Sequence, residues 1–223
     1  MAFTKRELLT ATGVGALLAT GTTYVTVVFG IVPLLIIGGA GVPAFLLWMA
    51  TYLRRPTDPA VLLPPFLATA AGFELHLTEE YLGHYAPAIS RIFNFAWTER
   101  EFVLICFVLT GALSLVAIGL GYRKTVAGIV AILFLATRLE ELGLFIFPLV
   151  RPALHPTVPG AISEAIAGVV VAGMPNYWQG AVGHYYFPGM YTVLLPMIPA
   201  AYALWRVWVT RATRAPHLVG DGG

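Results

Sequence analysis

The sequence contains little charge and almost no cysteine. Only 11% of its 223 residues are charged, whereas 58% are hydrophobic. A soluble domain carries about 25% charged residues, so this composition predicts that much of the protein surface contacts lipid. The single cysteine, Cys106, lies in an apolar run and is read as a small buried hydrophobe. One cysteine excludes both a disulfide framework and a cysteine-based zinc site within the chain.

A concentrated basic surface is also missing. The formal net charge is only +2, and the basic residues are spread along the chain rather than grouped in one patch. Nucleic-acid binding requires a basic stripe with interleaved aromatic residues, and this class of function is therefore excluded. Membrane lipid, and an apolar small molecule dissolved in it, are the partners that the composition favours.

Long apolar segments are what the sequence does have. Each membrane-spanning helix needs about 20 apolar residues, and the pattern predicts an all-α, polytopic transmembrane helix bundle of about six spans. Asp58-Pro59 has the residue types of a helix N-cap and first turn. Residues 161–173 are short for a span and predict a re-entrant or interfacial segment, and residues 85–99 predict an interfacial loop. The six spans are two within residues 8–53, then 59–83, 102–120, 125–147 and 188–209.

The apolar stretch at residues 8–53 is too long for one crossing. Two spans joined by a turn at residues 29–33 or 38–43 fit it better, because both places contain glycine and proline. The first 18 residues resemble a signal peptide, but no small-residue cleavage site follows them. A retained N-terminal membrane segment, residues 1–55, is therefore predicted, followed by a helical membrane domain at 56–210 and a flexible tail at 211–223.

The positions of the basic residues predict the orientation. Cytoplasmic loops of membrane proteins are enriched in lysine and arginine, and basic pairs occur here at four places: Lys5-Arg6, Arg54-Arg55, Arg123-Lys124 and Arg211 with Arg214. Two spans separate each place from the next, so all four can face the cytoplasm together. Both termini are then cytoplasmic.

The first candidate site lies on the predicted helix 59–83. His76, Glu80 and His84 are spaced at i, i+4 and i+8, with Glu79 beside them, so they form one stripe of a helix. Glu74 points to another face. Carboxylates within a membrane helix are costly unless they are paired, neutralised or bound to metal. His76, Glu79 and Glu80 are therefore predicted to be functional, whereas His84 can also be a simple interfacial side chain.

A second acidic pair, Glu140-Glu141, follows Arg138 on the predicted span 125–147. Glu140 and His76 lie at matching depth, each roughly 24 Å along its helix at 1.5 Å per residue. The two helices are thus predicted to place their polar residues in one cavity, in the outer part of the membrane. The alternative is that Arg138 and one glutamate form a structural ion pair that fixes helix register.

Two sequence elements carry a resemblance to a known family. His76-Leu77-Thr78-Glu79-Glu80 resembles the signature of the bacterial HXXEE-motif membrane proteins, a family of unknown function. The segment from Tyr186 to Thr192 resembles that family's Tyr-x-Pro-Gly-x-x-Thr element, and the resemblance covers residues 66–202. It implies a prokaryotic cytoplasmic membrane and supports His76, Glu79 and Glu80 as the site. A histidine that the family places on a later span is replaced here by Glu140-Glu141.

Three functions are compatible with these residues. The first is a membrane-embedded enzyme that acts on a lipid-soluble substrate with zinc, iron or manganese, for which the candidate ligands are His76, Glu79, Glu80, His84, Glu140 and Glu141. The second is metal-free acid and base catalysis by Glu79, Glu80 and Glu140, as in an isomerase or cyclase of sterol-like or terpene-like lipids. The third is proton or cation transport or binding.

Overall fold

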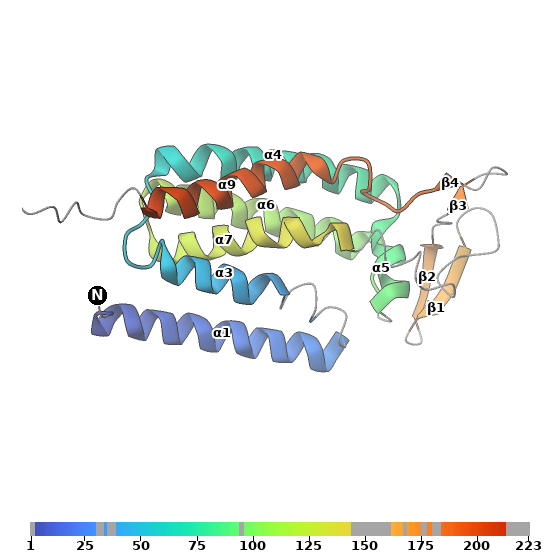
Figure 1. Cartoon of the computed structure of the whole chain (residues 1–223). Coiled ribbons are helices and arrows are strands. Elements are labelled where there is room, and N and C mark those ends of the chain that lie inside the picture. The colour runs from blue at the N-terminus through green and yellow to red at the C-terminus, as the bar shows by residue number, and fades with distance from the viewer. Residues whose placement is uncertain are drawn as a thin grey trace, which may run out of the picture.

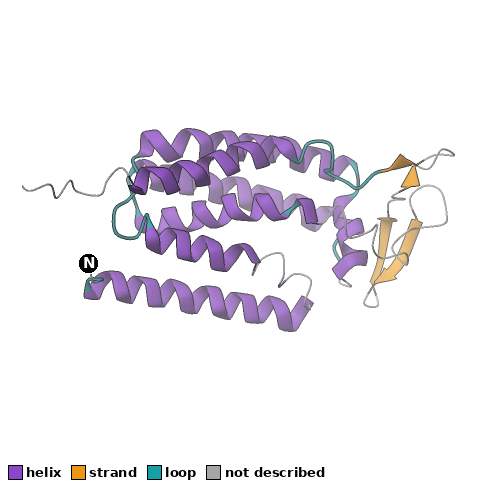
Figure 2. Ribbon diagram, in the orientation of Figure 1, coloured by secondary structure: helices purple, strands orange, loops and turns teal. Residues whose placement is uncertain are grey.

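The computed structural model of the chain describes residues 3–29, 34, 39–93, 96–143, 162–166, 169–174, 178–179 and 184–212. Within these residues the protein is a bundle of roughly parallel and antiparallel helices with two small β-hairpins beyond one end (Figures 1 and 2). The helices are α1 (Lys5–Phe29), α3 (Gly39–Ala50), α4 (Pro59–Leu82), α5 (Tyr85–Phe93), α6 (Glu99–Gly121), α7 (Thr125–Glu140) and α9 (Leu194–Ala212). The predicted helical bundle is therefore confirmed in its main feature.

The helix starts follow local chemistry. Asp58 caps α4 by accepting a hydrogen bond from the Ala60 N–H at 3.0 Å, and Pro59 occupies the first helical position. Thr98 and Glu101 form a capping box at the start of α6. The N-terminal helix α1 ends at Phe29 and α3 begins at Gly39, so residues 39–43 belong to a helix and do not form the turn.

Three of the described helices are long and apolar enough to cross a membrane, namely α1, α4 and α6. α3 and α7 are shorter, with 12 and 16 residues, and they pack against each other within the bundle. α7 ends at Glu140, before the predicted end of its span, and α9 begins at Leu194 because residues 188–193 form turns. The structure thus shows three candidate crossings rather than all six.

Two predicted segments have a different structure. Residues 85–93 form the helix α5 and not a loop, because Ala86 and Ile89 are buried on one face at helical spacing. The predicted re-entrant or interfacial segment contains an antiparallel hairpin of β1 (Ile162–Ile166) and β2 (Val169–Met174). Its β-branched residues favour strands over a short helix. A second hairpin joins β3 (Trp178–Gln179) to β4 (His184–Tyr185).

The contact between α4 and α9 sets the register of the functional site. A Cβ atom at Gly72 of α4 would lie 2.6 Å from the carbonyl carbon and oxygen of Leu195 in α9. The two backbones therefore touch where only glycine fits. Because His76 lies one turn beyond Gly72, and Thr192 lies just before Leu195, this contact places the two side chains opposite each other.

Gly72→Ala is accordingly expected to destabilise the bundle. Overpacking costs about 1–3 kcal/mol, and the clash here is with backbone, which cannot move aside as a side chain can. The melting temperature in detergent should fall by several degrees. Gly111→Ala in α6 is the matched control, since nothing lies within 4 Å of its added Cβ. Equal melting temperatures for the two variants would contradict the close approach of α4 and α9.

Candidate metal centre

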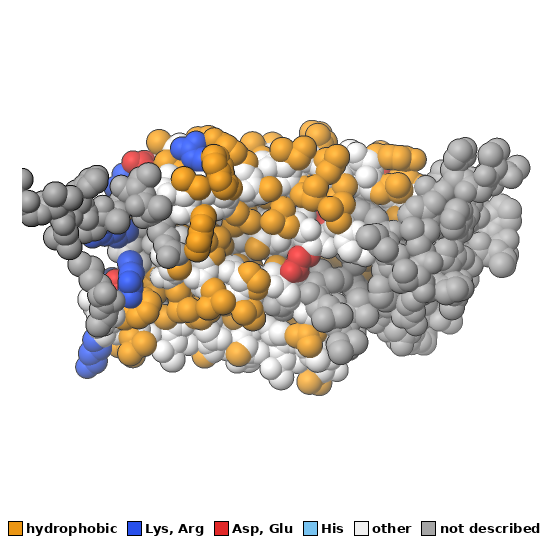
Figure 3. All heavy atoms as spheres, in the orientation of Figure 1, with side chains coloured by type: hydrophobic (Ala, Val, Ile, Leu, Met, Phe, Trp, Pro, Cys, Tyr) orange, Lys and Arg blue, Asp and Glu red, His pale blue; other side chains and the backbone are white. Residues whose placement is uncertain are grey.

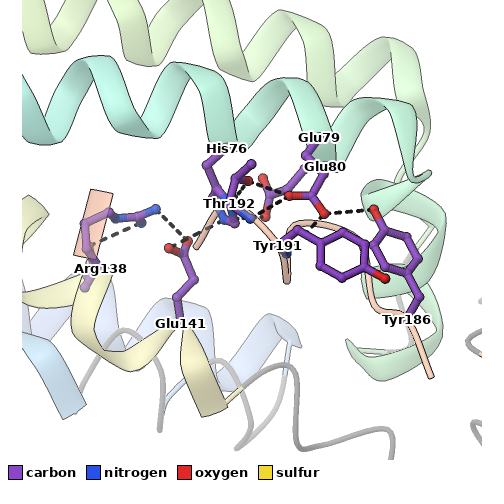
Figure 4. A network of polar contacts seen from close by, with 9 residues as sticks. His76, Glu79, Glu80, Arg138, Glu141, Tyr186, Tyr191 and Thr192 are labelled. Carbon is purple, nitrogen blue, oxygen red and sulfur yellow. Dashed lines mark hydrogen bonds and ion pairs between the residues drawn. The ribbon is translucent and has the colours of Figure 1, made fainter. Parts of the chain in front are cut away.

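Three potential metal ligands from two helices converge in the interior of the bundle. His76 and Glu80 come from adjacent turns of α4, and Glu141 follows the last residue of α7. His76 Nε2 lies 3.4 Å from Glu80 Oε1 and 3.7 Å from Glu141 Oε2 (Figure 4). The three residues are 0%, 3% and 7% exposed. An imidazole nitrogen and two carboxyl groups are thus brought together out of contact with solvent.

These separations suit one metal ion. Zinc binds histidine nitrogen and carboxylate oxygen at about 2.0–2.2 Å in tetrahedral geometry, which places neighbouring ligand atoms about 3.3–3.6 Å apart. The candidate ligand atoms all lie within 4.8 Å of one another, so movements of well under 1 Å for the nearer pairs would complete three-fold coordination. Such a set leaves the fourth position for water or substrate, as catalytic sites require.

Glu79 has another role in the structure. Its two carboxylate oxygens accept hydrogen bonds from the Tyr186 hydroxyl at 3.1 Å and the Tyr191 N–H at 3.2 Å, and also from the N–H and hydroxyl of Thr192 at 2.8 and 2.6 Å. A carboxylate has about four acceptor positions. Glu79 therefore uses these acceptor positions to bind residues 186–193, the segment before α9. Its carboxylate does not join the cluster of His76, Glu80 and Glu141.

That segment also contacts His76. The Thr192 hydroxyl lies 3.0 Å from His76 Nδ1. Gly189, whose backbone φ is +93°, lies against the imidazole ring of His76. A Cβ atom at Gly189 would be 2.6 Å from His76 Cε1. The two sequence elements of the family resemblance, although more than 100 residues apart, thus form one structure around His76.

Arg138 connects the cluster to the aromatic core. Its guanidinium donates to Glu141 Oε1 at 2.5 Å and lies over the Phe73 ring, 4.1 Å from the centroid. The predicted ion pair therefore forms with Glu141. It engages only one oxygen of Glu141, and the other, Oε2, is buried without a hydrogen bond from the described residues and faces His76. Arg138 thus orients one carboxylate of the cluster in addition to any structural role.

Two other predicted site residues lie outside the cluster. The Glu140 carboxylate is placed at the start of α3, where it accepts a hydrogen bond from the Ala40 N–H. His84 pairs with Glu99 in a partly exposed position, with side chains 44% and 38% exposed. Glu74 accepts a hydrogen bond from Thr110 of α6 at 2.7 Å. Of the predicted ligands, the structure brings together His76, Glu80 and Glu141.

Two tyrosines next to the site are kept in the protonated form. Burial raises the pKa of the Tyr85 phenol well above its ordinary value, and the charges of Glu80 and Glu141 raise it further. Burial and the charge of Glu79 likewise raise the pKa of Tyr186. Both hydroxyls therefore remain hydrogen-bond donors at neutral pH, as the bond from Tyr186 to Glu79 requires.

Sequence reasoning did not assign the roles of Gly189 and Thr192. Both lie in the Tyr-x-Pro-Gly-x-x-Thr element, and that element was the signal that could have identified them. No family model, curated protein or solved structure matches the chain. Its function must therefore be argued from the site.

Proposed function

We propose that this chain is an integral membrane enzyme that binds one divalent metal ion through His76, Glu80 and Glu141 and acts on a lipid-soluble substrate. The observation that carries the proposal is the convergence of these three side chains from α4 and α7, buried and at ligand spacing. Mixed imidazole and carboxylate ligands suit zinc, iron or manganese. A bound metal would supply a Lewis acid for hydrolysis or, with iron, a centre for oxidation.

The surface of the bundle supports a membrane location. Apolar side chains cover much of the face shown in Figure 3, and lysine and arginine side chains gather toward the end where the N-terminus lies. The same end holds the α3–α4 and α6–α7 connections and the C-terminal end of α9 (Figure 1). We propose six crossings in a prokaryotic cytoplasmic membrane, with this basic end in the cytoplasm.

The site then lies toward the outer face. His76 is the eighteenth residue of α4 counted from the basic end, or about 26 Å along the helix at 1.5 Å per residue. A hydrocarbon core of about 30 Å would place the cluster inside the membrane near its outer boundary. A substrate dissolved in that part of the bilayer is the class that this depth favours. We also propose that the chain belongs to the HXXEE-motif family.

A metal-free reaction is the second candidate, favoured by the contact of His76 Nε2 with two carboxylates. One proton shared among these groups could be given to and taken from an apolar substrate, as an isomerase or cyclase requires. In this case Glu80 would accept the proton from substrate carbon, and His76 would return it. The measurement that separates the two candidates is the metal content of the protein.

The purified protein is expected to contain close to one transition metal ion per chain. Metal should be measured by mass spectrometry on protein prepared in detergent without chelators. His76→Ala should abolish the signal because His76 is the one nitrogen donor among the three proposed ligands, whereas His84→Ala, which changes the pair with Glu99, should retain it. A parent protein that remains metal-free after zinc, iron and manganese are supplied would exclude the metal centre and favour proton chemistry.

A further inference from the structure

The hydroxyl of Thr192 lies between two ionisable side chains of α4. It donates a hydrogen bond to Glu79 Oε2 at 2.6 Å, and its oxygen is 3.0 Å from His76 Nδ1. Figure 4 shows the three side chains as a chain of contacts that leads to the cluster. Glu79 and His76 are only three residues apart on the helix, so the threonine from the segment before α9 connects neighbouring turns.

The number of available protons fixes the direction of these hydrogen bonds. Glu79 receives four donors, from Tyr186, Tyr191 and both donor groups of Thr192, and so acts as an acceptor only. A threonine hydroxyl has one proton, which it gives to Glu79. Toward His76, Thr192 can then only accept, so the proton of the imidazole lies on Nδ1.

The position of this proton also determines the state of the other ring nitrogen of His76, Nε2. In a neutral imidazole with its proton on Nδ1, Nε2 carries a lone pair, and here it faces Glu80 Oε1 and Glu141 Oε2 at 3.4 and 3.7 Å. Without Thr192, these two carboxylates would attract the proton to Nε2. With Thr192, a lone pair and two carboxylates face one another, an arrangement that favours a cation between them.

We propose that Thr192, oriented by Glu79, is a positioning residue that holds His76 in the Nδ1–H tautomer with Nε2 available to bind the metal. The inference rests on the proposed metal site for its functional consequence. It assigns to the first glutamate of the His-x-x-Glu-Glu sequence a role distinct from that of the second. Glu80 is a ligand, and Glu79 acts through Thr192 on the histidine.

Thr192→Val tests the proposal because it keeps the branched shape and the backbone N–H bond to Glu79 but removes the hydroxyl. Zinc affinity, measured by competition with a chelating dye in detergent, is expected to fall about 10–100-fold, the usual effect of losing a hydrogen-bond partner of a ligand histidine. Thr192→Ser restores the hydroxyl and should bind zinc nearly as tightly as the parent. Equal zinc affinity in the parent and the valine variant would overturn the inference.

A second measurement does not depend on metal. Nitrogen-15 NMR of the metal-free protein with labelled histidine, at a pH where the imidazole is neutral, should show the Nδ1–H tautomer for His76 in the parent and serine variant. The valine variant should shift toward Nε2–H. If the parent binds no metal but shows this shift, the metal function fails and the positioning role stands. If the parent binds zinc and its His76 is Nε2–H, the positioning role fails alone.

Discussion

Glu141→Gln is expected to lower the metal affinity of the protein by more than about 100-fold, whereas Glu140→Gln should leave it within about twofold. Removing a hydrogen-bond partner of a metal ligand lowers metal affinity by about 10–100-fold. Removing a charged ligand itself should lower the affinity further. Glu141 contributes Oε2 to the cluster, while the adjacent Glu140 contacts the start of α3. The neighbouring glutamate thus serves as a control with the same charge at the adjacent position of the chain.

The measurement is metal content together with competition binding on both variants. Glu141→Gln also removes the partner of Arg138, and breaking a buried ion pair costs about 3–5 kcal/mol. The double variant Arg138→Met, Glu141→Gln removes that unpaired charge, so a recovered melting temperature with continued loss of metal would separate ligation from folding. Metal loss in Glu140→Gln with retention in Glu141→Gln would contradict the assigned ligands.

The sequence could predict those parts of the site that depend on a single helix. Asp58-Pro59 identifies where α4 begins, and the spacing of His76 and Glu80 places both on one face. These inferences need only helix geometry. The cost of burying Glu80 within an apolar helix is likewise a local argument, and it predicts a functional site without reference to tertiary packing.

The choice between Glu140 and Glu141 could not be made in this way. Neighbouring positions on a helix point about 100° apart, and both glutamates follow the same apolar run. What separates them is tertiary packing. α3 lies against α7 and presents the Ala40 N–H to Glu140. Glu141 is directed toward α4, where His76 faces its Oε2, and its Oε1 pairs with Arg138 of α7.

The contribution of the segment before α9 depends on backbone conformation. Thr192 reaches His76 because the chain turns at Gly189 with a positive φ, and no helical or strand period predicts such a turn. The hairpins between α7 and α9 were missed for a related reason. Residues 162–174 are short and apolar, and a short apolar run is ambiguous between helix and strand.

Gly189→Ala is expected to abolish metal binding and to destabilise the protein. The new Cβ would lie 2.6 Å from His76 Cε1 and 3.0 Å from Glu80 Cγ, so it would displace both ligands from α4. The backbone adds a second penalty, because a left-handed conformation costs a residue with a Cβ about 1–2 kcal/mol. Together with about 1–3 kcal/mol for overpacking, this predicts a clear fall in melting temperature.

Gly121→Ala is the control, because no atom lies within 4 Å of its added Cβ and its φ is not positive. It should retain full metal content and the parental melting temperature. If Gly189→Ala retained both, the close contact of Gly189 with His76 would be excluded. Loss of metal with only a small fall in melting temperature would instead show that the turn at Gly189 acts chiefly on the ligands. Displacing His76 and Glu80 removes two of the three proposed ligands but leaves the α4–α9 contact at Gly72 in place.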